Sequence, residues 1–188
     1  MRFYHFFLLL SVFSIFPAVF TPVHAQFSIG MRVSPSIPFG SFQQRANFGG
    51  GVTLEGNYTS KSRYNLGLSF GYHQFSSGQE GYSFGINPLT LSAEYMLKYP
   101  EGFTPYVGVE AGLYTFSERV RGLTVNDSFA GFSPAVGFLY PLSTQLWFNG
   151  RVQYAILLTD EEALSFMPIS LGLRFTFSEY EKSPKSGL

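Results

Sequence analysis

Residues 64–75 read Tyr-Asn-Leu-Gly-Leu-Ser-Phe-Gly-Tyr-His-Gln-Phe, and this stretch decides the fold. Large apolar side chains occupy every second position from Tyr64 to Tyr72, with Asn, Gly and Ser between them. Successive side chains of a β-strand point to opposite faces of the sheet, so this alternation predicts a strand. One face of that strand is uniformly apolar, and the other is small and polar.

The same alternation recurs along the chain and predicts eight strands of about ten residues each. They are expected at 26–35, 50–59, 64–75, 88–99, 105–117, 130–140, 145–157 and 168–177. The charged residues inside these segments all lie on the polar parity: Arg32, Glu55, Glu94, Lys98, Glu110, Arg151 and Arg174. Random parity would give this arrangement roughly once in a hundred chains. Pro134 removes a ladder donor inside the sixth segment, where we expect a bulge or a later strand start.

Residues 1–25 resemble a secretory signal peptide, with a thin positive start at Arg2 and a long apolar stretch behind it. The small residues Val23 and Ala25 suit cleavage before Gln26. The barrel is expected at 26–177, followed by a short polar periplasmic tail at 178–188. The connections after the odd-numbered strands are expected to run roughly 10–14 residues and the others roughly 4–5, a pattern that puts both chain ends in the periplasm.

The composition excludes several classes of protein. Lys and Arg total 12 and Asp and Glu total 12, so no basic surface for nucleic acid is indicated. Charged residues make up 13% of the chain, about half the usual soluble share. There is no cysteine, which excludes disulfides and thiolate metal sites. No apolar run after residue 25 approaches the ~18 residues of a membrane-spanning helix.

The alternation alone does not decide which face points inward, because a soluble lipocalin-like barrel has its apolar face inside. Eight strands leave an interior just wide enough for side chains to fill. The apolar parity has more large side chains than that space can hold, whereas the polar parity has many glycines. The apolar face is therefore expected to contact lipid, with Tyr106, Tyr114 and Trp147 as inward aromatic residues.

Two features at the strand ends support a membrane location. Aromatic residues on the outward parity fall at the predicted periplasmic ends and form an interfacial girdle: Phe27, Tyr58, Tyr64, Tyr99, Tyr140 and Phe177. The last strand has a polar residue, a glycine two positions later, and hydrophobic residues further on: Ser170, Gly172, Phe175 and Phe177. This pattern resembles the C-terminal signal that outer-membrane assembly machinery recognises.

On these residues the chain resembles the small eight-stranded outer-membrane barrels of the OmpA/OmpX type. It is also similar to the outer membrane protein beta-barrel domain of Bacteroidetes-like bacteria. The resemblance covers 26–177 and implies an all-β, eight-stranded antiparallel up-and-down transmembrane β-barrel in the outer membrane of a Gram-negative bacterium. It implies little about activity.

Six of the charged residues are expected to face the lumen: Arg32, Glu55, Glu94, Glu110, Arg151 and Arg174. Unpaired buried charges cost several kcal/mol each, so they are expected to pair with one another. Such a network acts either as a fixed structural plug, which eight strands favour, or as a gate for a narrow pore. Lys98 is expected near a periplasmic end.

His73 is the single histidine after residue 25 and lies on the inward parity. A membrane-embedded lipid A hydrolase would need a nucleophile and a carboxylate near it, for which Ser69 and Glu94 are the candidates. No motif connects the three residues, so a hydrogen-bonded structural histidine is favoured. No cofactor and no metal site is expected.

A binding function is expected in the four long loops at 36–49, 76–87, 118–129 and 158–167. Their notable residues are Phe39, Phe42, Arg45, Phe48, Tyr82, Phe84, Arg119, Arg121, Asp160, Glu161, Glu162, Leu164 and Phe166. The aromatic residues form an adhesive surface, pack together as a loop cap, or rest in the lipopolysaccharide layer.

The expected function is a non-enzymatic structural, adhesive or surface-interaction role. A narrow channel for small solutes or ions is the alternative, and a lipid-modifying hydrolase is a third. The expected partners are outer-membrane lipids, lipopolysaccharide, the assembly machinery and a surface ligand at the loops. The chain is expected to be a monomer.

Overall fold

The computed structural model describes residues 26–60, 63–78, 81–98, 102–120, 123–159 and 162–177. The predicted leader at 1–25 and tail at 178–188 lie outside them. The elements are β1 Gln26–Phe39, η2 Gly40–Gln44, β2 Gly49–Thr59, β3 Tyr64–Ser76, β4 Tyr82–Met96, β5 Thr104–Val120, β6 Leu123–Pro141, β7 Leu146–Gln153, β8 Ala155–Leu158 and β9 Leu164–Thr176. Among the described residues, no helix is long and apolar enough to cross a membrane.

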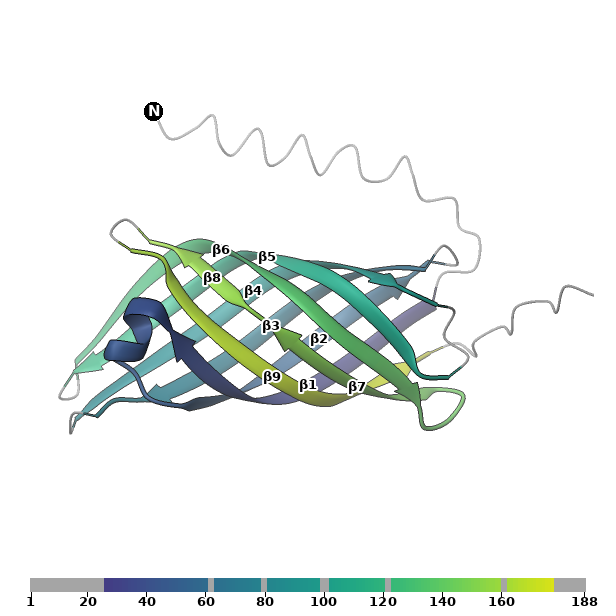
Figure 1. Ribbon diagram of the computed structural model, residues 1–188, viewed down its shortest axis with the longest axis horizontal. Coiled ribbons are helices and arrows are strands. Elements are labelled where there is room, and N and C mark those ends of the chain that lie inside the picture. Colours follow the sequence, from purple (N-terminus) through teal and green to yellow (C-terminus); the bar gives the residue numbers. More distant parts are fainter. Residues whose placement is uncertain are drawn as a thin grey trace, which may run out of the picture.

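The strands form one closed antiparallel sheet (Figure 1). From β1 to β7 each strand pairs with the next one in the sequence, β8 pairs with β9, and β1 pairs with β9 to close the ring. The short strands β7 and β8 both lie between β6 and β9, so together they fill one position. The ring therefore has eight positions, and the predicted eight-stranded up-and-down barrel is confirmed.

The strands tilt because the pairing register climbs around the barrel (Figure 1). A path through paired residues that leaves β1 at Ile29 returns to β1 at Phe39, ten residues further along. Its steps are Gly56, Leu68, Leu91, Ala111, Phe132, Ile156 and Ser165. A stagger of this kind gives a strand tilt of roughly 35–45° in closed barrels.

The prediction of a bulge or a later strand start at Pro134 is wrong on both counts, since β6 begins at Leu123. β6 runs through Pro134, and its register with Val109 on β5 is unbroken. The effect appears on the neighbouring strand, where Tyr154 separates β7 from β8. The Tyr154 N–H still donates to the Pro134 carbonyl (3.0 Å), whereas Pro134 has no N–H to return that bond. The proline thus removes one ladder bond and leaves the register unchanged.

The two faces of the barrel have opposite character, as predicted. Outward apolar side chains are widely exposed; Leu68, for example, has 54% of its surface accessible. Inward polar and charged residues are buried, and Arg32 is only 2% accessible. On β1 the outward apolar residues extend from Phe27 to Ile37. At about 2.5 Å of axial rise per tilted residue, this gives the apolar belt of about 25 Å that a membrane barrel needs.

The predicted strand ends and loop lengths are wrong at the end that has η2, here called the outer end. The connections there are 40–48, 77–81, 121–122 and 159–163, so most of the expected loop residues belong to strands. β5 and β6 form the longest hairpin, in which Thr115 pairs with Ser128 and Arg119 with Thr124. The opposite end, called the inner end, has the connections 60–63, 97–103 and 142–145. Outward side chains of the hairpin are polar because this part of the sheet extends beyond the apolar belt.

Candidate functional site

The six charged residues predicted to face the lumen come together in the middle of the barrel. They are contributed by β1 (Arg32), β2 (Glu55), β4 (Glu94), β5 (Glu110), β7 (Arg151) and β9 (Arg174). All six are buried. The inward faces of β3 and β6 contribute small residues at this level, including Ser69 and Ser133.

These residues form a closed ring in which arginine and glutamate alternate. Its ion pairs, in order, are Arg32–Glu55 (3.3 Å), Glu55–Arg174 (3.0 Å), Arg174–Glu94 (3.5 Å), Glu94–Arg151 (2.5 Å), Arg151–Glu110 (2.8 Å) and Glu110–Arg32 (3.6 Å). Every arginine therefore meets two glutamates, and every glutamate meets two arginines. The ring has no net charge, which is the condition for keeping six ionised groups away from water.

Neutral polar groups complete the contacts of the carboxylates. Asn65 donates to Glu94 (2.5 Å), Thr90 donates to Glu110 (3.2 Å), and Asn149 donates to Glu55 (3.4 Å). Inward glycines provide the room: a Cβ on Gly30 would lie 2.7 Å from a carboxylate oxygen of Glu55. The middle of the lumen is thus filled by side chains.

An apolar cluster narrows the lumen at the inner end, beside a small hollow of about 20 Å³ whose lining includes Ser28, Thr176 and Arg174. It consists of Met96, Tyr106, Leu139 and Trp147. The Tyr106 hydroxyl donates to Asn149 (2.9 Å), and the guanidinium of Arg151 lies 6.0 Å from the centre of the Tyr106 ring. Lys98 is not part of this layer. β4 ends at Met96, and the exposed Lys98 lies over the ring of Phe103 at 5.8 Å.

An aromatic cap closes the outer end, defined here as Phe42, Phe75, Phe84, Phe116 and Phe166. Phe42 belongs to η2 and is only 1% accessible. Its ring lies 5.0 Å from Phe75, 5.8 Å from Phe84 and 6.0 Å from Phe116. Phe166 packs on Phe75 at 5.6 Å.

The sequence did not predict Phe75 and Phe116 as part of a cap, and it assigned Phe42, Phe84 and Phe166 to loops. The sequence left three alternatives open for the loop aromatic residues. For Phe42, Phe84 and Phe166 the structure has the alternative in which they pack into a cap. A usable signal was present, since Phe75, Phe84 and Phe116 continue the inward parity of their strands.

The candidate hydrolase residues are not brought together. His73 is buried, and its Nδ1 forms a hydrogen bond with the Ser36 hydroxyl (3.0 Å) beside the Phe166 ring (5.3 Å). Ser69 instead bonds Thr90 (2.7 Å), and Glu94 belongs to the ring of ion pairs. Within the described part of the chain, no three His, Asp or Glu side chains come together in a group that could hold a metal ion.

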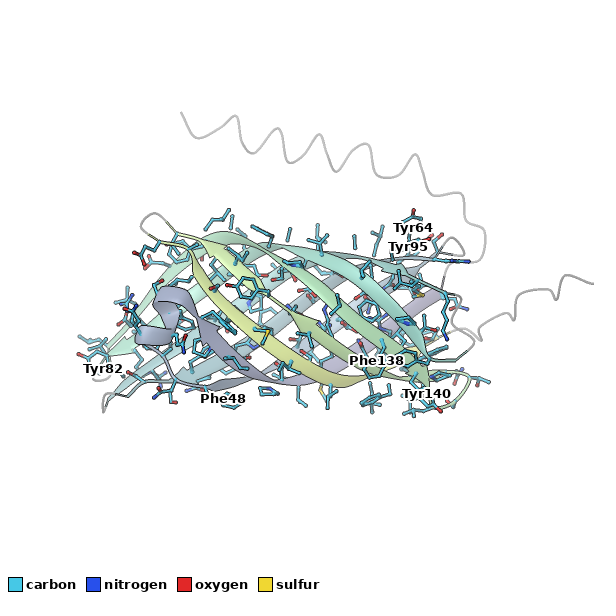
Figure 2. All side chains as sticks on the ribbon, viewed as in Figure 1. Phe48, Tyr64, Tyr82, Tyr95, Phe138 and Tyr140 are labelled. Carbon is cyan, nitrogen blue, oxygen red and sulfur yellow. The ribbon has the colours of Figure 1, made fainter. Side chains whose placement is uncertain are left out.

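The girdle residues lie at the inner end, where Figure 2 shows Tyr64 and Tyr95 side by side. Tyr64 packs on Tyr95 at 5.2 Å, and Phe27 packs on Tyr58 at 5.7 Å. Tyr140 and Phe177 are exposed, and Tyr99 lies outside the described residues. Of the last-strand pattern, Ser170 is buried in the lumen, Gly172 faces inward, and Phe175 and Phe177 face outward.

The remaining loop residues lie around the outer rim. Phe48 is exposed, and Phe39 packs on Tyr154 at 5.8 Å. Arg45 forms an ion pair with Glu118 (3.5 Å), and Arg119 is exposed. Arg121, Asp160 and Glu161 lie outside the described residues, whereas Glu162 is exposed, and Tyr82 and Leu164 are half-buried.

Comparison with solved structures shows the same fold. The chain is 16% identical to Neisserial surface protein A, with a TM-score of 0.68 over 82% of this chain and 100% of that one. It is 15% identical to the N-terminal β-barrel domain of Pseudomonas aeruginosa OprF (TM-score 0.54, 82% and 100%). It is 16% identical to Ail, the attachment invasion locus protein of Yersinia pestis, in complex with a heparin analogue (TM-score 0.52, 80% and 97%).

No curated protein matches the sequence. The model of one protein family, the outer membrane protein beta-barrel domain, matches residues 6–177. That match covers most of the chain and agrees with the closed barrel, its apolar belt and its polar lumen. This chain therefore belongs to the outer membrane protein beta-barrel domain family.

Proposed function

We propose that this protein is a closed, non-conducting and non-enzymatic barrel that acts through the surface it presents outside the outer membrane. The observation that supports this most is that buried side chains occupy the lumen at three successive levels. The inner apolar cluster narrows the lumen, and the ring of ion pairs and the aromatic cap fill it with buried side chains.

A conducting pathway would have to cross all three levels. An ion passing the ring would compete with pairs that are already matched, and at the cap it would meet phenylalanine rings with no polar partner. The channel alternative would therefore need Phe42 to leave its place and the ring to open. A hydrolase is not favoured because His73 forms a hydrogen bond with Ser36 and has no carboxylate partner among the residues that the structure describes.

The outer surface is the remaining place for function. The β5–β6 hairpin extends beyond the apolar belt and presents polar side chains outward. Two structural neighbours have names that describe a surface protein and an attachment protein, which supports a structural or adhesive role here. The partners we propose are the lipids around the belt, lipopolysaccharide, a surface ligand at the hairpin, and the assembly machinery that would recognise Ser170, Gly172, Phe175 and Phe177.

The test is single-channel conductance of the refolded protein in a planar bilayer, with folding verified by the shift in gel mobility on boiling. The wild-type protein should give no discrete current steps. A variant with Phe42→Ala, Glu94→Ala and Arg151→Ala, which removes parts of the cap and the ring, is the control expected to give them. Reproducible wild-type steps that change in size with Glu94→Gln would contradict the proposal and establish the channel.

A further inference from the structure

A hollow lies on the outward wall of β2, β3 and β4 near the outer end. It has a volume of about 510 Å³ and is lined by residues that include Phe48, Gln74, Ser76, Tyr82 and Ser83. A second hollow of about 210 Å³ adjoins it and shares Gln74 and Ser83. Figure 2 shows Phe48 and Tyr82 toward the end of the barrel opposite to Tyr64 and Tyr95.

Glycines open this hollow. Gln74 pairs with Gly50 on one side and with Gly85 on the other. A Cβ on Gly85 would come no closer than 3.6 Å to Ser117, and a Cβ on Gly50 no closer than 3.7 Å to the Ser34 carbonyl. Neither glycine has a positive φ. The backbone and the packing would thus accept a side chain at both positions, and the space above Gln74 is open because the residues are glycine.

The hollow begins where the apolar belt ends. Along β3 the outward residues change from Phe70 and Tyr72 to Gln74 and Ser76. Along β4 the change falls between Leu89 and Asn87. The hollow therefore lies at the level of the lipid headgroups, on the side of the barrel rather than at its tip.

The lining has the chemistry that binds sugars. The hydroxyls of Ser76 and Ser83 and the amide of Gln74 can exchange hydrogen bonds with sugar hydroxyls, and Phe48, which is 62% accessible, offers an apolar ring face. Tyr72 already orients Gln74 by donating to its side-chain carbonyl (3.0 Å). Arg119, which lines the second hollow, is exposed and forms no ion pair with any described residue. It is suited to a phosphate or carboxylate group.

We propose that this hollow binds the anionic core saccharide of a glycolipid in the outer leaflet of the same membrane. The aromatic and hydroxyl groups contact the sugar, Arg119 contacts its acidic substituent, and the acyl chains lie along the apolar belt below Tyr72. This inference rests on the proposed function, which includes lipopolysaccharide among the partners, and does not depend on whether the lumen conducts.

The experiment uses the full mature barrel in nanodiscs that contain phospholipid and lipopolysaccharide with its core sugars. After transfer to detergent, the lipopolysaccharide retained per barrel is measured by native mass spectrometry. The wild-type protein should retain about one molecule, and Gly85→Leu, which places a side chain beside Gln74 in the second hollow, should lower retention at least tenfold. Gly56→Leu is the matched control, because Gly56 also faces outward but lies in the apolar belt with nothing within 4 Å of its Cβ.

Two further probes identify the recognised part of the ligand. Lipid A without core sugars should be retained far less, and Arg119→Gln should weaken retention of the complete molecule. Equal retention by wild type and Gly85→Leu would overturn the proposal, as would equal retention of lipid A that lacks the core sugars. Binding of the free core oligosaccharide as tight as that of the complete lipopolysaccharide would also overturn it, in favour of a site for soluble glycans. Heat-dependent gel mobility verifies that each variant is folded.

Discussion

Substitution of Glu94 by Gln tests the ring of ion pairs. Glu94 contacts Arg151 at 2.5 Å and Arg174 at 3.5 Å, and all three side chains are nearly inaccessible to water. The variant leaves three arginines facing two glutamates, with one positive charge uncompensated. Removing one partner from a buried pair costs about 3–5 kcal/mol, so the free energy of unfolding should fall by about that much.

The assay is equilibrium unfolding in urea, followed by the fluorescence of Trp147, the single tryptophan of the chain, which is buried at the inner end. Glu118→Gln is the matched control, because its ion pair with Arg45 is partly exposed and should be worth about 0–1 kcal/mol. The double variant Glu94→Gln/Arg151→Gln should lose less than the sum of the two single variants, because four balanced charges remain. If Glu94→Gln costs no more than Glu118→Gln, the ring is solvated and the argument for a sealed lumen is wrong.

Two further predictions concern the belt and the cap. Leu68→Arg should lower the free energy of unfolding in lipid vesicles by about 2–4 kcal/mol, since Leu68 faces lipid within the belt. Leu123→Arg, at the first residue of β6 and beyond the belt, should change it by less than about 1 kcal/mol. Equal losses in the two variants would contradict the placement of the belt. Phe42→Ala should lower the free energy of unfolding in the urea assay by about 3–5 kcal/mol, because it empties the centre of the cap. Phe48→Ala, on the exposed rim, should change it by no more than about 0.5 kcal/mol. If Phe42→Ala leaves the free energy of unfolding unchanged, η2 does not seal the lumen.

The sequence was sufficient for the barrel and for the direction of its faces. Alternation with a period of two residues follows directly from the geometry of a β-strand, so it predicts strands from the sequence alone. The large apolar side chains were too many to fit inside an eight-stranded barrel, which excluded an inward apolar face. Six charges on one parity predicted a network, because a narrow lumen leaves them no other partners. Their cyclic order depends on the stagger of the strands, which no single segment specifies.

The ends of the strands at the outer rim could not be predicted. The predicted strands ended within a few residues of the last outward apolar side chain; on β5 that residue is Leu113, and the predicted strand ended at 117. Beyond the membrane, however, a strand needs no apolar outer face, and pairing such as Thr115 with Ser128 continues it. The contribution of the strands to the cap was missed for the same reason, because Phe75 and Phe116 were placed at the ends of predicted strands and Phe84 in a loop rather than on a continuing inward face.

The position of Glu55 in the ring has a consequence for the order of assembly. Its two arginine partners, Arg32 and Arg174, belong to the first and the last strand of the barrel. In an open sheet these edge strands are apart, so the bridge from Arg174 to Glu55 can form only when β1 and β9 meet. The complete set of ion pairs in the lumen can therefore form only when β1 and β9 have paired and every strand is in register. A sheet that closes with a strand missing or shifted leaves charges unmatched.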